Sequence, residues 1–564
     1  MSWEEEFRRN IERTRQRIME IAPDMLDLKA HRAPMPSASG RGAVPRPFGR
    51  SATITHNWGS AAMVPETSRP DPARPGPYPT CASKSTIFHK HLGVPVSLIA
   101  YAPGTQISGS QCQSSAGNCP LVVIFHARPT GNVPLATYYL AYEPFARHLA
   151  SYGFVVVSVG WGGVEQFAKT GGLLPPLLGW INGGNLGIDG IASGDLVLVG
   201  HSFGGEIADK SATPETLKGY GYKLRSVVLI SPSYDDVVPS SFISSAPESV
   251  LVLHDVLDSD PGASGGEPGS KPVVTSAVRS YERAGQLEGT LNTSPPAFVK
   301  HLVYAGVNPA DPDIDIPFLS HYYQNTSFSR GAVAAFLLGY VRNQTVYRQF
   351  FRRQLAVQGV TGLLDIEGTV YDGSSPPALS HMHAEPSELT VIDWNSPMAS
   401  AVVQGEIESG IALLPDEDNW TLNHGLVLRV MFARGGLCQL TVTVDFSKIT
   451  VGDYKFLSLA ICQSNVAKEP LLGRVLGTVF ISSTKSKSEF AIKLDDIGGF
   501  LVYRGDLTRR RVCMENLVLA LDDIASEVDL SLIDRIRFEF QASGNPGKNA
   551  VILLGNMKLI GKGP

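Results

Sequence analysis

Along the middle of the chain, short and continuous runs of apolar residues alternate with segments of helical periodicity. The runs are rich in Val, Ile and Leu and carry no alternating polar positions. Such runs indicate strands buried on both faces, and helical segments between them indicate parallel pairing. Residues 87–356 are therefore predicted to form an α/β domain with a mostly parallel sheet. Its strands are expected at 96–102, 121–125, 154–159, 196–199, 226–230, 250–253 and 298–304.

Two segments of this domain have the apolar spacing of amphipathic helices. Residues 141–152 are predicted as a helix that ends before Gly153, because glycine is common directly after a helix C-terminus. Residues 330–351 are predicted as one long helix that closes the domain.

The hydrophobic pattern changes in the C-terminal part of the chain. Residues 357–386 are rich in Gly, Ser, Pro and His and are interpreted as a linker. Over residues 387–564, short strand patterns recur between turn signals, which predicts an all-β, jelly-roll-like sandwich. In the segments 533–540 and 544–554 it resembles carbohydrate-binding modules. The strands are expected at 426–432, 438–444, 456–462, 475–481, 490–494, 535–541 and 550–559.

The N-terminal segment has no strand pattern. Residues 1–30 place apolar side chains such as Trp3, Phe7 and Ile11 at helical spacing, which predicts an amphipathic helix that docks on the body of the protein or on a partner subunit. Residues 31–86 are rich in Pro, Gly, Ser and Arg without periodicity, and we expect an extended arm there. A homo-oligomer is compatible with this arrangement.

Bulk properties narrow the classes of partner. At 564 residues two or more domains are expected, and a net charge of -5 gives no footprint for nucleic acid. No apolar run reaches transmembrane length, and the acidic N-terminus lacks the layout of a signal peptide. We expect a cytoplasmic protein, with secretion open if a leader was removed. Cys112 and Cys119 flank a Gly/Ser loop and are expected either as a local disulfide or as two reduced thiols.

The most specific motif is Gly-His-Ser-Phe-Gly at residues 200–204, directly after the apolar run at 196–199. A strand followed by Gly-x-Ser-x-Gly and a helical pattern predicts a nucleophile elbow, a sharp turn that exposes a serine hydroxyl at the sheet edge. Small neighbours are needed because the turn is crowded and strained. Ser202 is therefore the candidate nucleophile.

A serine nucleophile requires a base, and an acid that holds the base in its reactive tautomer. In this type of fold the acid and then the base follow the serine along the chain. Asp258 follows the strand at 250–253 and is our candidate acid, with Asp260 as the near alternative and Asp255 as the weaker one. His321 lies between the strand at 298–304 and the closing helix and is the candidate base.

An oxyanion hole needs two preorganised N–H donors. The backbone N–H of Phe203 is expected as one donor. Ala127 or Arg128, in the loop after the strand at 121–125, is expected to supply the other, with Arg128 favoured. The Arg128 side chain is then left to meet an anionic substrate, and His126 is expected to anchor the loop by a hydrogen bond.

Aromatic residues are expected at the same edge of the sheet. Trp161 and Tyr322 lie in loops there and are candidates for substrate binding, as part of an aromatic acyl or alcohol pocket. No motif for a metal, a nucleotide or a dinucleotide stands in the expected structural context.

With these residues assembled, the chain resembles serine esterases of the α/β-hydrolase superfamily, in the group of platelet-activating-factor acetylhydrolase, chlorophyllase, dienelactone hydrolase and cutinase-like polyester hydrolases. The resemblance covers about residues 90–355 and is carried by residues 121–126, 148–156, 200–205 and 335–340. It implies an α/β-hydrolase fold and ester hydrolysis through an acyl-enzyme, without metal or organic cofactor. The implied substrate is a small-molecule, lipid or polymer ester. An amidase, lactonase or acyltransferase with the same triad, or a binding protein with a decayed hydrolase core, are the alternatives.

Overall fold

The structure is a computed structural model that describes the chain in separate ranges. These are residues 72–128, 135–234, 247–255, 280, 284, 299–305, 327–351, 379–444, 446–463, 475–494, 515–542 and 549–561, with shorter gaps inside several of them. The helix predicted over residues 1–30 and most of the predicted arm lie outside the described residues.

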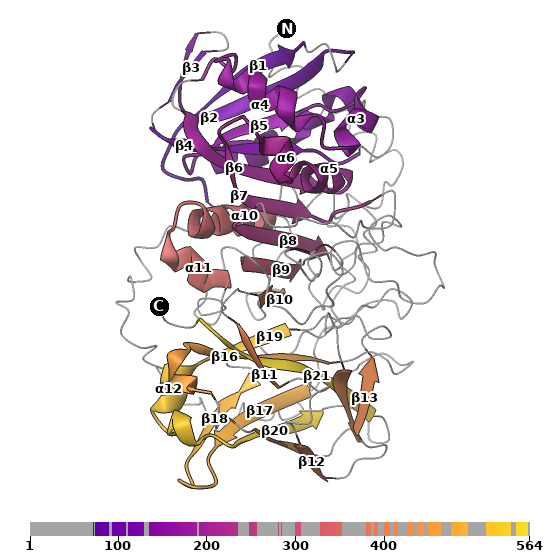
Figure 1. Cartoon of the computed structure of the whole chain (residues 1–564), viewed down its shortest axis with the longest axis vertical. Helices are drawn as coiled ribbons and strands as arrows, with labels where there is room; N and C mark the ends of the chain where they lie inside the picture. The colour runs from indigo at the N-terminus through magenta and orange to yellow at the C-terminus, as the bar shows by residue number, and fades with distance from the viewer. Residues whose placement is uncertain are drawn as a thin grey trace, which may run out of the picture. The chain divides into compact units, whose positions relative to one another are not determined.

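The chain up to residue 384 is built around one ten-stranded mixed sheet with the strand order β1-β2-β5-β4-β6-β7-β8-β9-β10, in which β3 pairs with β2 (Figure 1). Strands β5, β4, β6, β7, β8 and β9 run parallel, while the outer pairs are antiparallel. This confirms the predicted α/β class and the mostly parallel sheet. The strands are β1 (Thr80–Ile87), β2 (Val96–Ser108), β3 (Gln111–Ser114), β4 (Cys119–Phe125), β5 (Val155–Val159), β6 (Ile191–His201), β7 (Lys223–Ile230), β8 (Ser249–Asp255), β9 (Val299–Ala305) and β10 (Leu379–Ala384).

The order of the strands reverses at β4. This strand lies between β5 and β6, so the chain turns to one side after β4 and to the other side after β5. In open α/β sheets such a reversal leaves a crevice at the carboxyl ends of the strands, where ligands bind. The loop after β4 and the turn after β6 therefore start side by side, since Phe125 pairs with Gly200 at the ends of their strands.

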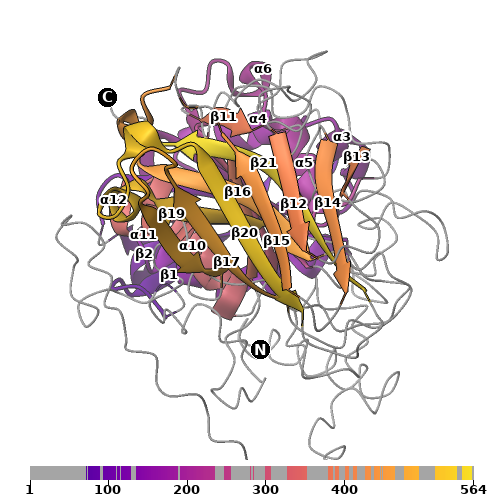
Figure 2. The ribbon, with the colours of Figure 1, turned by 90° about the horizontal axis from the view of Figure 1, so that it is seen from below.

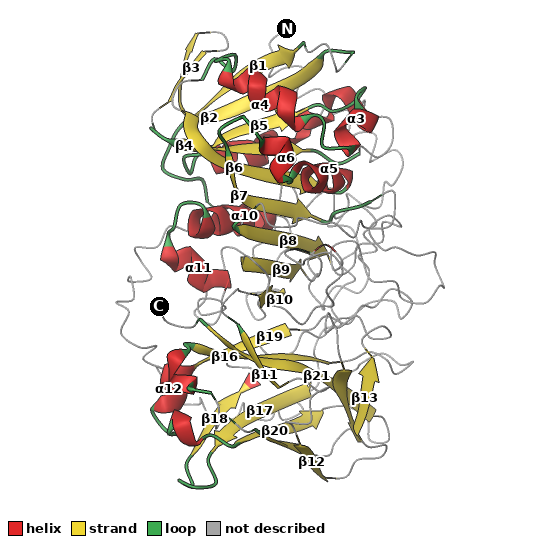
Figure 3. Ribbon diagram, in the orientation of Figure 1, coloured by secondary structure: helices red, strands yellow, loops and turns green. Residues whose placement is uncertain are grey.

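Helices accompany the strands in this part of the chain, as Figure 3 shows. Every residue of β4 and β5 is buried, which explains why their sequences are almost entirely apolar. The hydroxyl of Ser158 on β5 donates to the Tyr139 carbonyl at 2.8 Å. Helix α2 packs against β2 and β5, and α5 packs against β4, β6 and β7. The helices up to this point are η3 (Leu135–Tyr142), α2 (Glu143–Ala150), α3 (Glu165–Lys169), α4 (Leu174–Asn182), α5 (Phe203–Ser211) and α6 (Pro214–Leu217).

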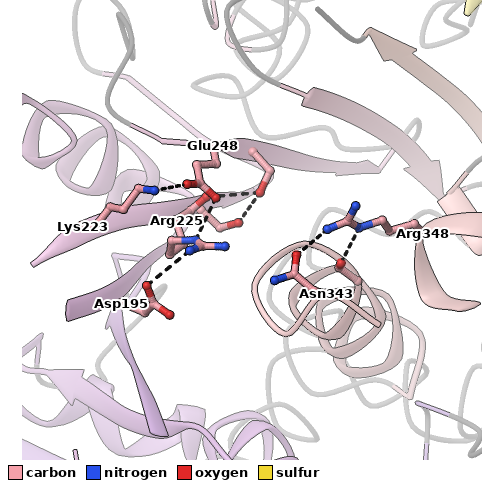
Figure 4. A network of polar contacts seen from close by, with 9 residues as sticks. Asp195, Lys223, Arg225, Glu248, Asn343 and Arg348 are labelled. Carbon is pink, nitrogen blue, oxygen red and sulfur yellow. Dashed lines mark hydrogen bonds and ion pairs between the residues drawn. The ribbon is translucent and has the colours of Figure 1, made fainter. Parts of the chain in front are cut away.

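The long helix predicted over residues 330–351 is instead two helices, α10 (Ser327–Tyr340) and α11 (Thr345–Phe351). The chain leaves the helical conformation at Asn343, whose φ is 58°. Arg348 stabilises the break, because its Nε donates to the Gly339 carbonyl at 2.7 Å and its Nη2 donates to Asn343 Oδ1 at 2.6 Å (Figure 4). The apolar periodicity does not report hydrogen bonds made by a side chain across a turn, so the sequence pattern did not predict the break between α10 and α11.

Two strands occupy segments that were predicted without regular structure. β1 lies at the end of the predicted arm and pairs with β2 along its whole length. β10 lies in the predicted linker and pairs antiparallel with β9. Both predictions were wrong at these positions, because short polar strands gain their stability from pairing with a sheet already formed and not from their own apolar content.

The C-terminal part consists of two antiparallel sheets, with the orders β13-β14-β21-β16-β19, where β11 pairs with β21, and β12-β15-β20-β17-β18 (Figure 2). They share one apolar core, in which the rings of Phe432 on β14 and Phe540 on β20 lie 6.3 Å apart. The predicted all-β sandwich is thus present, and its jelly-roll connectivity stays a prediction. The seven predicted strands are β14 (Leu426–Ala433), β15 (Leu437–Thr443), β16 (Phe456–Gln463), β17 (Val475–Ser482), β18 (Glu489–Lys493), β20 (Arg535–Ala542) and β21 (Asn549–Ile560).

The sequence pattern missed the remaining elements of this part. They are the strands β11 (Leu389–Ile392), β12 (Ser400–Gly405), β13 (Ile411–Pro415) and β19 (Glu515–Ala520), and the short helices η7 (Val451–Asp453), α12 (Leu521–Ala525) and η9 (Leu530–Leu532). Most are short, so each carries too few positions for a periodicity to stand out.

Cysteine pairing differs from both expectations. Cys112 forms a disulfide with Cys81, with the two Cα atoms 5.8 Å apart, while Cys119 is a buried free thiol. The bridge joins β1 to β3, two strands that both pair with β2. Cys119 is nearer to Cys112 in the sequence, but the disulfide forms with Cys81, because the pairing of β1 and β3 with β2 brings these two residues together.

At the amino edge of the parallel strands, charged side chains are paired with one another. Arg225 Nε lies 2.8 Å from Glu248 Oε2, Arg225 Nη1 lies 3.6 Å from Asp195 Oδ1, and Lys223 also pairs with Glu248 (Figure 4). These ion pairs tie the starts of β7 and β8 to β6. Within the described residues, no helix is long and apolar enough to cross a membrane.

Candidate active site

Ser202 stands in the strained turn between β6 and α5. Its φ of 52° and ψ of -123° lie in a region that L-residues rarely adopt. The turn is held by neighbouring backbone, since the Ser202 N–H donates to the carbonyl of Ile230 at the end of β7 at 2.9 Å. Ser202 itself is 7% exposed. The predicted strand-turn-helix arrangement around this serine is therefore present.

The glycines of the motif are required by close backbone contacts. A Cβ atom on Gly204 would lie 2.1 Å from the carbonyl oxygen of Phe125, and a Cβ atom on Gly200 would lie 2.3 Å from the carbonyl oxygen of Gly204. Atoms cannot approach this closely, so any larger residue at either position would push α5 away from the sheet. The first turn of α5 thereby lies directly against the end of β4.

The start of α5 provides a place for developing negative charge. Phe203 is the first residue of this helix, so its N–H has no acceptor within the helix. The helix dipole adds partial positive charge at the same end. This is the position expected for one donor of an oxyanion hole.

The loop after β4 contains the candidates for the second donor. The Ala127 N–H donates to the hydroxyl of Tyr142 at 2.9 Å, inside the protein. This hydrogen bond engages the Ala127 N–H within the protein. The choice between Arg128 and Ala127 as the second donor stays a prediction.

His126 fixes the start of this loop. The ring is fully buried, its Nδ1 donates to the Ala127 carbonyl at 2.7 Å, and it stacks on Trp161 with centroids 4.8 Å apart. The expected anchoring hydrogen bond is thus present. Burial lowers the pKa of His126 to about 4, so the ring is neutral at pH 7.

Trp161 contacts the same loop through His126. Its Nε1 donates to the His126 carbonyl at 3.0 Å, and its ring contacts that of Phe203 at a centroid distance of 5.2 Å. Trp161 is 0% exposed, so in this structure its contacts are with protein. Its predicted role in substrate binding stays a prediction.

The side chains of Arg128 and Phe203 pack on each other. The Arg128 guanidinium lies 3.8 Å from the centroid of the Phe203 ring and forms an ion pair with Glu165. Lys169 Nζ lies 5.0 Å from the same centroid. The Arg128 side chain, which was expected to meet an anionic substrate, is therefore engaged by Glu165 and Phe203 and helps to hold its own loop.

Several predicted site residues lie outside the described residues, namely Asp258, Asp260, His321 and Tyr322. Their strands are described, however. β8 and β9 run parallel to β6, so their carboxyl ends open at the same sheet edge as Ser202. The last residue of β8 is Asp255, three positions before Asp258 in the sequence.

Sequence reasoning missed Tyr142 as a member of this region. It lies at the end of η3, and its hydroxyl oxygen is 2.6 Å from Nδ1 of His201, the residue before the nucleophile. The sequence could not predict these two contacts, because Tyr142 is 15 positions from Ala127 and 59 positions from His201. Among the described ranges, no group of three or more metal-ligating side chains is found.

Comparisons with known proteins give distant similarities. No family model and no curated protein matches the chain. Among solved structures, it is similar to a hyperthermophilic esterase from the archaeon Pyrobaculum calidifontis, at 15% identity and a TM-score of 0.28, with 47% of this chain and 84% of that chain covered. A fungal esterase from Rhizomucor miehei matches at 12% identity and a TM-score of 0.28, with 49% and 87% covered.

A third similarity is to a family 11 carbohydrate-binding module of a cellulosomal cellulase from Clostridium thermocellum. Its identity is 10% and its TM-score 0.20, with 31% of this chain and 94% of that chain covered. The TM-scores of these three similarities lie between 0.20 and 0.28.

Proposed function

We propose that this protein is a serine carboxylic-ester hydrolase with Ser202 as its nucleophile. The observation that carries the proposal is the conformation of Ser202, held at φ 52° between a buried strand and the N-terminus of α5. A strained residue of this kind persists only where the surrounding structure enforces it, and such residues concentrate at functional sites. The close contacts of Gly200 and Gly204 are the enforcing structure.

In the proposed reaction, Ser202 Oγ attacks the ester carbonyl carbon while its proton passes to His321. Asp258, with Asp260 as the alternative, orients His321. The N–H groups of Phe203 and Arg128 bind the oxyanion of the tetrahedral intermediate. When the intermediate collapses, the alcohol leaves with the proton from His321, and the acyl group stays on Ser202. Water then attacks the acyl-enzyme, releases the carboxylic acid and restores Ser202. No step requires a metal or an organic cofactor.

The test is turnover of p-nitrophenyl butyrate by the wild-type protein and by two serine variants. Ser202→Ala should lower kcat/KM by at least about 10³-fold, because the nucleophile is lost. Ser211→Ala, at the other end of the same helix, is the matched control and should stay within about twofold of wild type. Turnover by Ser202→Ala equal to that of wild type would overturn the proposal.

The same assay distinguishes the neighbouring activities. An anilide, a lactone and a competing alcohol, each tested beside the ester, separate an amidase, a lactonase and an acyltransferase from an esterase. A wild-type protein that turns over none of these substrates would instead indicate a binding protein with a decayed hydrolase core.

A further inference from the structure

Three polar rings are buried in and next to the loop after β4, which holds the proposed oxyanion donor. His126, Tyr142 and His201 are 0%, 1% and 0% exposed, and they come from the loop after β4, from η3 and from the end of β6. Burial of polar groups costs free energy unless hydrogen bonds compensate, so their arrangement is strongly constrained. The proposed reaction uses none of these three side chains directly.

Tyr142 makes both hydrogen bonds of this group. Since the Ala127 N–H can only donate, the Tyr142 oxygen accepts at 2.9 Å. Burial raises the pKa of Tyr142 well above its ordinary value, so the hydroxyl keeps its proton. The same hydroxyl forms a hydrogen bond with His201 Nδ1, 2.6 Å away.

This chain of hydrogen bonds connects the two halves of the proposed oxyanion hole. One end is Ala127, next to the proposed donor Arg128, and the other end is His201, two positions before the proposed donor Phe203. A single hydroxyl thus links the loop after β4 to the turn that holds the nucleophile. It also holds the Ala127 N–H inside the protein, directly before the proposed donor Arg128.

We propose that Tyr142 is a positioning residue that sets the geometry of the oxyanion hole through Ala127 and His201. The inference rests on the proposed function, because it assigns the device by which that same site binds the transition state. Removing the Tyr142 hydroxyl would release the Ala127 N–H and allow the loop to shift relative to Phe203. Catalysis is sensitive to such shifts, since a displacement of about 1 Å can lower rates by about 10²-fold.

The first test is Tyr142→Phe, assayed with p-nitrophenyl butyrate. We expect kcat to fall about 10- to 100-fold with KM within about twofold of wild type, because the lost contact acts on the transition state. Tyr139→Phe is the matched control. Tyr139 lies on the same helix η3 and is 2% exposed, and its hydroxyl forms a hydrogen bond with Ser97. Both variants should melt a few degrees below wild type, and only Tyr142→Phe should lose kcat.

A transition-state analogue separates positioning from general damage. An aryl trifluoromethyl ketone forms a tetrahedral adduct with serine that carries an oxyanion, whereas butyrate as product resembles the ground state. In Tyr142→Phe the inhibition constant of the ketone should rise by the same factor as kcat/KM falls, and that of butyrate should stay unchanged. Equal losses for both ligands would show a disrupted site and overturn the inference.

Two variants of His201 keep the inference testable if Tyr142→Phe does not fold. The amide group of asparagine carries both an acceptor and a donor and can replace Nδ1 as the partner of Tyr142, so His201→Asn should retain most of kcat. His201→Leu removes the hydrogen-bonding partner and should lose kcat as Tyr142→Phe does. Equal kcat in the two variants would overturn the inference.

The outcomes separate this inference from the proposed function. If Ser202→Ala turns over ester as wild type does, the proposed function fails and the inference falls with it. If Ser202→Ala is inactive while Tyr142→Phe keeps kcat within twofold of Tyr139→Phe, the inference alone is overturned.

Discussion

The strained backbone at Ser202 predicts an unusual order of stability between two variants that lack its hydroxyl. Ser202→Ala keeps a Cβ atom and therefore keeps the strain of φ 52°, ψ -123°. Ser202→Gly removes the Cβ atom, and glycine adopts positive φ with little penalty. The glycine variant should therefore be the more stable of the two, although at an ordinary position it would be the less stable.

The magnitude follows from two opposing terms. A non-glycine residue in a sparsely populated region costs about 1–3 kcal/mol, which the glycine variant recovers. Glycine loses more conformational entropy on folding than alanine does, which costs about 0.5–1 kcal/mol. The net difference in the free energy of unfolding is about 1 kcal/mol in favour of Ser202→Gly.

Urea unfolding of both variants, followed by circular dichroism, measures this difference. Ala208 provides the control, because it is a buried residue in the interior of α5. There Ala208→Gly should be less stable than the wild-type protein by about 1 kcal/mol. If Ser202→Gly is as stable as Ser202→Ala or less so, the turn at Ser202 is not strained and the reasoning is refuted.

Two further predictions concern stability. Loss of the Cys81–Cys112 disulfide, which closes a loop with a sequence separation of 31, should lower the free energy of unfolding by about 3–4 kcal/mol, and equal melting with and without reductant would contradict this. For His126, whose pKa is lowered by burial from 6.5 to about 4, the unfolded chain takes up a proton that the folded protein does not. Stability should therefore fall as the pH drops from about 6.5 to about 4, by about 3 kcal/mol in total. In His126→Gln this part of the pH dependence of the free energy of unfolding should be absent. If urea unfolding at several pH values gives the same pH dependence for His126→Gln and wild type, the prediction is wrong.

The disulfide also bears on location. Disulfides such as Cys81–Cys112 persist mainly in oxidising compartments, and the cytoplasmic location expected from the sequence stays a prediction. Labelling of free thiols in protein isolated from its native source under non-reducing conditions would show which cysteines are paired.

What the sequence predicted well was local. The buried strands were readable because continuous Val, Ile and Leu are needed where both faces of a sheet are covered. The turn at Ser202 was readable because the backbone contacts of Gly200 and Gly204 exclude larger residues within one short motif. Both features can be predicted from neighbouring residues alone, without knowing which distant segments of the chain are in contact.

What the sequence could not predict depended on distant contacts. The partner of Cys112 is set by the pairing of β1 and β3 with β2, and the break after α10 is set by Arg348 reaching back across the turn. Tyr142 belongs to the site through two hydrogen bonds to residues far away in the sequence. Periodicity and spacing carry no information on such contacts.

The central claim is that Ser202 is a reactive nucleophile, and covalent labelling tests it most directly. The full chain is treated with a fluorophosphonate, digested, and the peptide containing residues 200–205 is examined by mass spectrometry. We predict one phosphonyl adduct per chain, located on Ser202 and absent from Ser202→Ala. A folded wild-type protein that remains unlabelled, or one labelled equally with and without Ser202, would contradict the account.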